Sequence, residues 1–247
     1  MKGKQCGLRS QEQYEPSDFE VGSEILGYGI SFPPPGLPVA NYIIGNEHLE
    51  SEELVSYEIG YRLKTSERSS IDMTAFIFDF DKITTTADGG VPTGVPLATY
   101  SQLTNKTKAY NWGFEITGVY AFSDKLKLMA TWSYLHMNKV YPLIDRGNPT
   151  DETLTPQNQA NIRLYYDITE RLSFNTAIYY VDNISGSDIP SRIKLDTGLI
   201  YKVHEKLELF FYGRNLTDEY AQEAGTDFGF QTKEIPRHFY AGLNFKF

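Results

Sequence analysis

The 247-residue chain has little of what marks several common protein classes. Its one cysteine, Cys6, cannot form an internal disulfide, so the thiol is either free or, as the alternative, lipid-modified. No run approaches about 18 consecutive apolar residues, which excludes a helix that crosses a bilayer. Lys and Arg number only 23 against 32 Asp and Glu, and this deficit of positive charge argues against nucleic acid as a partner.

Motifs for catalysis and metal binding are also missing. The histidines lie on separate segments, with no partner at metal-ligand spacing: His48, His136, His204 and His238. No Gly-x-Ser-x-Gly elbow occurs, and the glycine-rich stretch 88–94 (DGGVPTG) lacks the Lys-Ser/Thr pair of a phosphate loop. We therefore expect no enzyme activity, no cofactor and no metal site.

The most informative pattern that is present lies at residues 237–247 (RHFYAGLNFKF), where apolar and polar residues alternate strictly. The apolar set is Phe239, Ala241, Leu243, Phe245 and Phe247. Successive side chains of a strand point to opposite faces, so this segment has one apolar and one polar face. Such a pattern is typical of a strand between lipid and a wet lumen. The alternative is a half-buried edge strand of a soluble sheet.

Alternation of this kind recurs through residues 52–247 and predicts nine antiparallel strands joined in pairs by short turns. The turns fall at residues 66–68, 123–125, 169–171 and 204–206, and the connections between pairs are long: 84–108, 139–157, 183–190 and 219–236. Outer-membrane barrels combine short periplasmic turns with longer extracellular loops. We therefore predict an all-β fold that is part of an antiparallel transmembrane β-barrel, with the long connections outside the cell.

The N-terminal stretch differs from the rest. Residues 1–51 hold clustered Pro and Gly and few strand signals, so we expect an irregular, loop-rich segment there, followed by the barrel part at 52–247. No charged, apolar, small-residue leader opens the chain. A barrel protein must cross an inner membrane, so we expect that the start is truncated or incorrectly assigned.

Four segments carry a family resemblance. Residues 45–62 (GNEHLESEELVSYEIGYR) resemble the Asn-Pro-x-Leu-x-x-Glu-x-x-x-x-Tyr-Glu-Leu-Gly-Tyr stretch of TonB-dependent outer-membrane receptors, with Glu47 replacing the usual Pro. Matching positions there are Glu52, Tyr57, Glu58, Gly60 and Tyr61. Residues 195–203 (LDTGLIYKV), 213–221 (GRNLTDEYA) and 234–247 are similar to the closing strands of the same family. The matching positions in the last two are Asn215, Leu216, Asp218, Tyr220, Pro236 and Arg237.

This resemblance, over residues 45–247, implies a bacterial outer-membrane barrel of about 22 strands whose lumen is blocked by a plug. It implies TonB-dependent uptake of a ferric siderophore or a similar metal chelate. The implied partners are outer-membrane lipid and the barrel assembly machinery, whose recognition signal would be the final strand, and the ligand and the TonB system for an intact receptor. Nine strands without a plug lead us to expect a truncated piece of such a receptor. The alternatives are a porin-like passive barrel without TonB coupling and a secreted soluble β-sheet binding module.

The charged residues of the expected strands occupy the polar alternate positions: Glu115, Lys127, Arg163, Asp167, Lys194, Asp196 and Lys202. A Lys or Arg on the lipid face costs about 2 to 4 kcal/mol at the membrane midplane. We expect these side chains to line a hydrated interior. Contact with the plug and plain solvation of the inner wall are both consistent with that position.

Overall fold

The computed structural model of the protein describes residues 3–5, 9–14, 25–32, 38–90, 98–140, 153–224 and 233–246. The strands are β1 (Gly3–Gln5), β2 (Arg9–Tyr14), β3 (Ile25–Ser31), β4 (Val39–Ile44), β5 (Glu52–Ser66), β6 (Ser69–Gly90), β7 (Ala98–Ala121), β8 (Leu126–Val140), β9 (Asn158–Asp167), β10 (Leu172–Val181), β11 (Arg192–His204), β12 (Leu207–Arg214), β13 (Tyr220–Ala224), β14 (Lys233–Pro236) and β15 (His238–Phe245). One 3-10 turn, η2 (Ser185–Ser187), interrupts them. Among these residues, no helix has the length and the hydropathy needed to cross a membrane.

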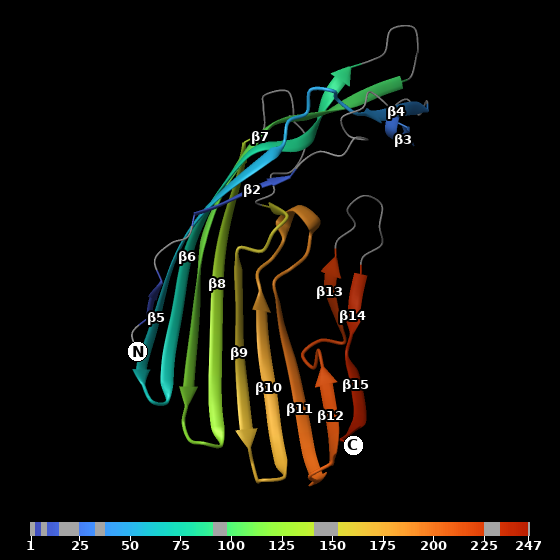
Figure 1. Ribbon diagram of the computed structural model, residues 1–247. Helices are drawn as coiled ribbons and strands as arrows, with labels where there is room; N and C mark the ends of the chain where they lie inside the picture. The colour runs from blue at the N-terminus through green and yellow to red at the C-terminus, as the bar shows by residue number, and fades with distance from the viewer. Residues whose placement is uncertain are drawn as a thin grey trace.

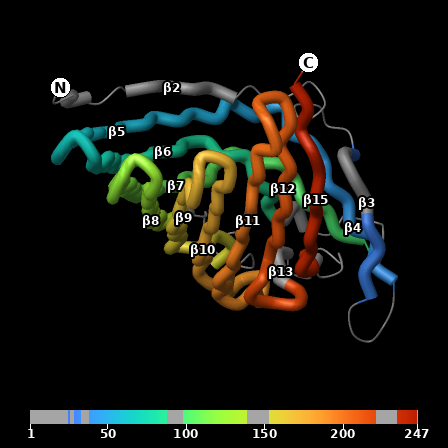
Figure 2. Tube along the Cα trace, turned by 90° about the horizontal axis from the view of Figure 1, so that it is seen from below, coloured from blue at the N-terminus to red at the C-terminus, as the bar shows by residue number. Residues whose placement is uncertain are grey.

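Most strands form one continuous wall. Its order is β1-β5-β6-β7-β8-β9-β10-β11-β12-β15, with each of the pairs antiparallel. The strands lie side by side with the short turns at the lower end (Figure 1), and seen from below they follow a curve (Figure 2). Within the described residues β15 pairs with β12 alone, so this edge of the wall is open. The predicted antiparallel barrel portion is confirmed as an open, curved wall.

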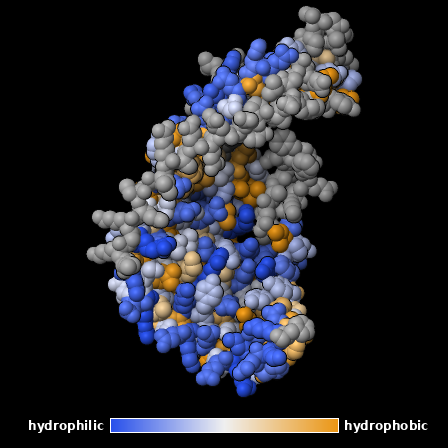
Figure 3. All heavy atoms as spheres, viewed as in Figure 1, coloured by the Kyte–Doolittle hydropathy of each residue, from blue (hydrophilic) through white to orange (hydrophobic). Residues whose placement is uncertain are grey.

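All nine strands predicted from alternation are present, as β5 to β12 and β15. The four short turns connect them as expected; at one of them, for example, the Thr169 N–H donates to the Leu172 carbonyl at 3.1 Å. Hydrophilic side chains gather at this lower end of the wall (Figure 3). The alternating pattern therefore predicted these nine strands and their pairing correctly.

The expectation that residues 1–51 are irregular is wrong for the part that the structure describes. β1 and β2 both pair with β5, with Gly3 opposite Arg62 and Arg9 opposite Tyr57, so together they occupy one strand position and raise the wall from nine strands to ten. β3 and β4 form a hairpin. β2 has the sequence RSQEQY, in which neither alternate set is apolar, so no pattern marked it as a strand. Pairing with an open strand edge supplies its hydrogen bonds instead. The proposed boundary after residue 51 remains a prediction.

Two of the predicted long connections also contain strands. β6 continues to Gly90 and β7 begins at Ala98, so much of 84–108 is strand, and β4 adds to β7 in parallel. Together with β3, these extensions form an arm that projects beyond the wall (Figure 1). Residues 219–236 likewise contain the β13–β14 hairpin. The sequence predicts loops for these segments because they are mostly polar, and hydrophobic alternation fades where a strand has no buried face.

Register places one alternate set of side chains from every strand between β5 and β15 on the same face, here called the apolar face. Its exposed members include Ile59, Ile77, Trp112, Trp132, Ile162, Ile178, Leu199, Phe211 and Phe239. Buried apolar residues in the described part are few: Ala98, Ala109 and Ile189. The accessible surface is 16895 Å², against about 11,000 Å² for a compact monomer of this mass. The wall is a single layer without a core of its own.

Aromatic residues border the apolar face at two heights. On β7, Trp112 lies toward the arm and Tyr120 toward the lower turns, both partly exposed. At about 3.3 Å per residue, the eight-residue separation corresponds to about 26 Å along the strand. The apolar band of an outer-membrane barrel is about 25 Å tall and is flanked by aromatic girdles. The apolar face therefore has the dimensions of a membrane-contacting surface.

Candidate functional site

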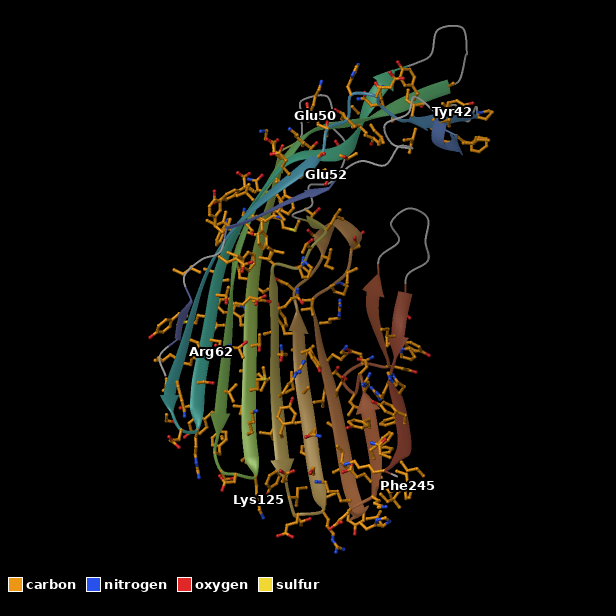
Figure 4. All side chains as sticks on the ribbon, viewed as in Figure 1. Tyr42, Glu50, Glu52, Arg62, Lys125 and Phe245 are labelled. Carbon is orange, nitrogen blue, oxygen red and sulfur yellow. The ribbon has the colours of Figure 1, made fainter. Side chains whose placement is uncertain are left out.

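Ion pairs concentrate where the arm leaves the wall, a place we call the charged junction (Figure 4 labels Glu50 and Glu52 there). Lys82 has a positive φ of 59°, and its Nζ lies 2.7 Å from Glu50 Oε2 and 3.0 Å from Glu53 Oε1. The Thr84 N–H donates to Glu52 Oε1 at 2.6 Å. The β6–β7 register shifts at this point. Glu52 and Glu53 of β5, together with Glu50 just before it, therefore stabilise the irregular backbone at which β6 leaves the wall.

Contacts at the charged junction shift the pKa values of two of its side chains, Lys82 and Asp81. Hydrogen bonds from Lys82 to Glu50 and then Glu53 raise the pKa of the Lys82 ammonium. Lys108 donates to Asp81 Oδ2 at 2.9 Å, and this hydrogen bond is the main reason why the pKa of Asp81 is lowered. These shifts favour the charged forms of the Lys82 ammonium and the Asp81 carboxylate.

A second junction lies where β12 ends, and we call it the buried junction. Asn215 has a φ of 53° and no exposed surface. Its N–H donates to Asp196 Oδ1 at 3.0 Å on β11, and its Nδ2 donates to the Ile235 carbonyl at 3.0 Å on β14. The Leu216 N–H donates to the Leu195 carbonyl at 2.8 Å. One asparagine thus joins the end of the wall to the β13–β14 hairpin above it.

A third carboxylate acts at the end of β10. Asp182 accepts hydrogen bonds from Asn158 Nδ2 at 3.0 Å, from the Asn183 N–H at 3.1 Å and from the Tyr180 hydroxyl at 3.2 Å. The hydrogen bond from Asn158 is the main cause of its lowered pKa. At three strand ends opposite the short turns, a carboxylate therefore accepts a backbone N–H: Glu52, Asp196 and Asp182.

The residues singled out by resemblance fall into two groups that the fold keeps apart. Glu52 belongs to the charged junction, whereas Tyr57 and Tyr61 lie on the apolar face of β5 and Glu58 and Gly60 on its other face. The second group gathers at the buried junction around Asn215 and Leu216, where Tyr220 pairs with Pro236 and the Arg237 N–H donates to the Glu219 carbonyl at 2.9 Å. Asp218 lies between these in the chain. Six strands separate β5 from β12 in the wall, so the two groups do not form one site.

The face opposite the apolar one, here called the polar face, carries the charged residues predicted for a wet interior. Register places all seven on it: Glu115, Lys127, Arg163, Asp167, Lys194, Asp196 and Lys202. Two of them, Arg163 and Asp196, line a hollow of about 210 Å³ on β9 to β12 together with Arg214 of β12, and we call it the basic hollow. Sequence reasoning missed Arg214, although it occupies a polar position of β12, as well as Asp81 and Lys82.

Glycines shape the polar face by letting aromatic rings lie against the backbone. Gly198 is directly opposite Tyr212, and Gly242 is directly opposite Phe210. The Phe210 ring would lie 2.5 Å from a Cβ at position 242, and the Tyr212 ring would overlap one at position 198. A side chain at either glycine would displace the ring, so Gly198 fixes how Tyr212 lines the basic hollow.

The closing strand presents its expected apolar set to the outside of the wall. Phe239, Ala241, Leu243 and Phe245 share the apolar face, and Phe239, Leu243 and Phe245 are all more than half exposed. Phe245 lies near the lower end of β15 (Figure 4). Phe247 lies outside the described residues, and the assembly role of this strand remains a prediction. No group of three His, Cys, Asp or Glu in the described residues is placed to hold a metal ion.

A curved antiparallel wall with one apolar and one charged face has the architecture of a transmembrane β-barrel. Residues 13–216 match the family described as TonB dependent receptor-like, beta-barrel. The chain belongs to this family. It is a family of receptors. No curated protein matches the chain in sequence.

Solved structures show the same fold. They include a mutant of the ferric enterobactin receptor PfeA of Pseudomonas aeruginosa (19% identity, TM-score 0.73), the siderophore receptor PirA of Acinetobacter baumannii (18%, 0.72) and the copper transporter OprC (15%, 0.69). Each alignment covers 98% of this chain but 38% of the other chain. The sequence therefore spans less than half the length of these receptors.

Proposed function

We propose that the chain forms part of the barrel wall of a TonB-dependent receptor in the outer membrane of a bacterium. The receptor takes up a ferric siderophore or a similar metal chelate. The observation that carries the proposal is the family match over residues 13–216 on a wall whose outer face is continuously apolar. The named ligands of the similar structures are iron chelates and copper, which supports a scarce metal as cargo.

The apolar face weighs against a secreted soluble module, because that face would remain in water. Patches on soluble monomers rarely exceed a few hundred Å². A porin-like passive barrel shares this face but has no plug and no TonB coupling. Reading the DNA upstream of the chain in the same frame distinguishes the two: a plug-encoding stretch supports the receptor, and its absence from an intact gene contradicts it.

Transport is tested in cells that carry the complete gene. Growth on a ferric siderophore under iron limitation should depend on the gene and should be lost in TonB-deficient cells. Uptake that persists without TonB would point to the passive barrel. The complete receptor should be recovered from the outer-membrane fraction in both strains, because insertion of the barrel does not require TonB.

For the chain by itself, we propose that it does not form a closed transporter. The wall has an open edge at β15, and the chain covers 38% of the similar receptors. Unpaired strand edges template aggregation, so the chain expressed alone should aggregate or require denaturant and detergent. A monodisperse preparation in detergent-free buffer would contradict both this proposal and membrane insertion.

Orientation follows from the lengths of the connections. Lys125 lies at the end of the wall opposite the arm (Figure 4). We infer that the arm and the connection 139–157 face the cell exterior and that the turn at Lys125 faces the periplasm. Epitope tags inserted in 141–152 should be reachable on intact cells carrying the complete receptor. Tags in the turn 123–125 should be reachable only after the outer membrane is permeabilised, and the reverse pattern would refute this orientation.

We further propose that the closing strand is the signal read by the barrel assembly machinery, with Phe247 its most sensitive position. Deleting Phe247 from the complete receptor should lower the amount of folded protein in the outer membrane without lowering ligand affinity per folded molecule. Lys246→Ala is the matched control, because it changes the adjacent polar position. Equal outer-membrane levels for both variants and the wild type would show that the terminal aromatic carries no assembly information.

A further inference from the structure

A groove opens in the apolar face where β5, β6 and β7 lie side by side, and we call it the Ala75 groove. Its volume is about 580 Å³. Ala75 of β6 is exposed and lies directly between Ile59 of β5 and Phe114 of β7. Among the described residues that line the groove on this face, Ala75 has the shortest side chain. The two flanking strands therefore form ridges on either side of it.

Large side chains form the two ridges. The ridge on β5 consists of Tyr57 and Ile59, which are 50% and 60% exposed. The ridge on β7 consists of Trp112 and Phe114. Phe114 packs edge-on against Trp132 of β8, with ring centroids 4.9 Å apart. The β7 ridge is thus supported from the side away from the groove, so the groove is formed before any occupant enters it.

The lining of the Ala75 groove is almost entirely apolar. Among the described residues that line it, the one charged residue is Glu58, and register directs the Glu58 side chain to the polar face. Tyr57 and Tyr110 lie at the end of the groove nearest the arm. A polar group placed over Ala75 would lose its hydrogen bonds to water without gaining others. The occupant is therefore apolar along the length that lies in the groove.

Position and size indicate what this occupant is. The groove follows β7 from Tyr110 to Phe114, which is about 13 Å along the strand. It includes Trp112, which borders the apolar face toward the arm, so the groove is continuous with the membrane-contacting surface. Its volume falls in the range of about 300 to 1,000 Å³ that holds whole small molecules. The apolar molecules that surround such a surface are membrane lipids.

Packing gives the Ala75 groove an advantage over the rest of the apolar face. Lipid tails are as apolar as the side chains that they touch, so the hydrophobic effect favours no particular place on this face. An acyl chain on a flat part of the face has protein atoms on one side only. An acyl chain over Ala75 also contacts the ridges on β5 and β7. Each added contact is weak, but many of them together hold the acyl chain in place.

We propose that the Ala75 groove holds one acyl chain of an outer-leaflet lipid at a fixed place on the wall. The inference rests on the proposed function only in placing the apolar face in an outer membrane with the arm outside. Ile59 and Phe114 contact the acyl chain from two sides, and Ala75 leaves the depth that it needs. Tyr57 and Tyr110 lie where the acyl chain joins its headgroup, a level at which amphipathic aromatic rings are enriched in membranes.

The test uses the complete receptor in vesicles of palmitoyl-oleoyl phosphatidylcholine that contain a small fraction of the same lipid with a diazirine on its palmitoyl chain. After photolysis, labelled positions are quantified by mass spectrometry. Labelling at Ile59, Ala75 and Phe114 should exceed labelling at Ile178 and Leu199 by at least about threefold, since the latter lie on the same face outside the groove. Equal labelling of the two regions would show ordinary contact with bulk lipid and would overturn the proposal.

Ala75→Phe fills the groove and should reduce labelling there to the level found on β10 and β11. Ala130→Phe is the matched control, because it makes the same substitution on the same face of β8 outside the groove, and it should leave the labelling unchanged. Equal loss in both variants would overturn the proposal, as would a groove that is labelled in vesicles but protected in native outer membranes, which would indicate a protein occupant. The comparison within the wild type does not depend on how either variant folds. Because neither transport nor TonB enters this experiment, it can fail separately from the uptake experiment.

Discussion

The charged junction and the buried junction both interrupt a regular strand, but one is part-exposed and the other is buried. In each, a residue with positive φ, Lys82 or Asn215, breaks the regular strand, and a carboxylate on a neighbouring segment accepts a backbone N–H. The side chains at the charged junction are part-exposed and form ion pairs, whereas Asn215 has no exposed surface and donates hydrogen bonds to a carboxylate and to a backbone carbonyl. The difference teaches that the buried junction contributes stability, while the charged junction directs the arm.

The largest effect is expected at the buried junction. Asn215→Ala should lower the free energy of unfolding in detergent by about 2 to 3 kcal/mol, because it loses the bond to Ile235 and places alanine at positive φ. Asn215→Gly keeps the backbone conformation and should lose only about 1 kcal/mol. Urea titration of both variants provides the measurement. Equal losses would show that backbone conformation contributes nothing there.

The acceptor of the buried junction should have a smaller effect. Asp196→Asn retains an oxygen but removes the negative charge that accepts the Asn215 N–H, so we expect a loss of about 1 kcal/mol. The double variant D196N/N215G should lose less than the sum of its parts, since both changes weaken the same junction. Strict additivity in the urea titration would mean that the two residues act separately.

At the charged junction, Glu52→Gln should cost about 0.5 kcal/mol or less, because the amide oxygen still accepts the Thr84 N–H and the site is part-exposed. Its main consequence should be faster hydrogen exchange in the arm, with exchange in β9 to β12 unchanged. If the wall and the arm were affected equally, the junction would be a stabilising element like the buried one.

Lys82 should show the smallest net effect and the strongest salt dependence. Lys82→Gly loses the ion pairs to Glu50 and Glu53 but relieves a positive φ, so the two contributions oppose one another. Lys108→Gly is the control, because it loses an ion pair to Asp81 without that backbone gain. Proteolysis of the arm in low and high salt should show a weaker salt dependence in Lys82→Gly than in the wild type, because only the Lys108–Asp81 pair remains.

Acid should loosen the charged junction. The pKa of Asp81 is lowered in the folded chain, so its contribution is present above the ordinary aspartate pKa, about 3.9, and is lost as the pH falls through the folded value. Hydrogen exchange of the arm should therefore accelerate below about pH 4. Asp81→Asn should flatten this dependence, and an unchanged profile in that variant would assign the acid sensitivity to another group.

The two junctions also differ in how far the sequence revealed them. Asn215 was found through a motif, because the family resemblance marks it, but its contacts to Asp196 and Ile235 join residues 19 and 20 positions away. Lys82 carried no signal, since a lysine in a polar stretch is indistinguishable from a solvated one. The basic hollow was predicted only in part: alternation placed Arg163 and Asp196 on the polar face, but it does not say which strands bring Arg214 to the same hollow.

What the sequence determined by itself is the wall: nine strands, their turns and the face of each side chain. Alternation suffices for these features because a strand has a period of two and each short turn forces its flanking strands to pair. What only the tertiary structure decided is the tenth strand position, the arm and both junctions. These depend on backbone hydrogen bonds between distant segments, which polar sequences such as β2 and the extensions of β6 and β7 make without any periodic pattern.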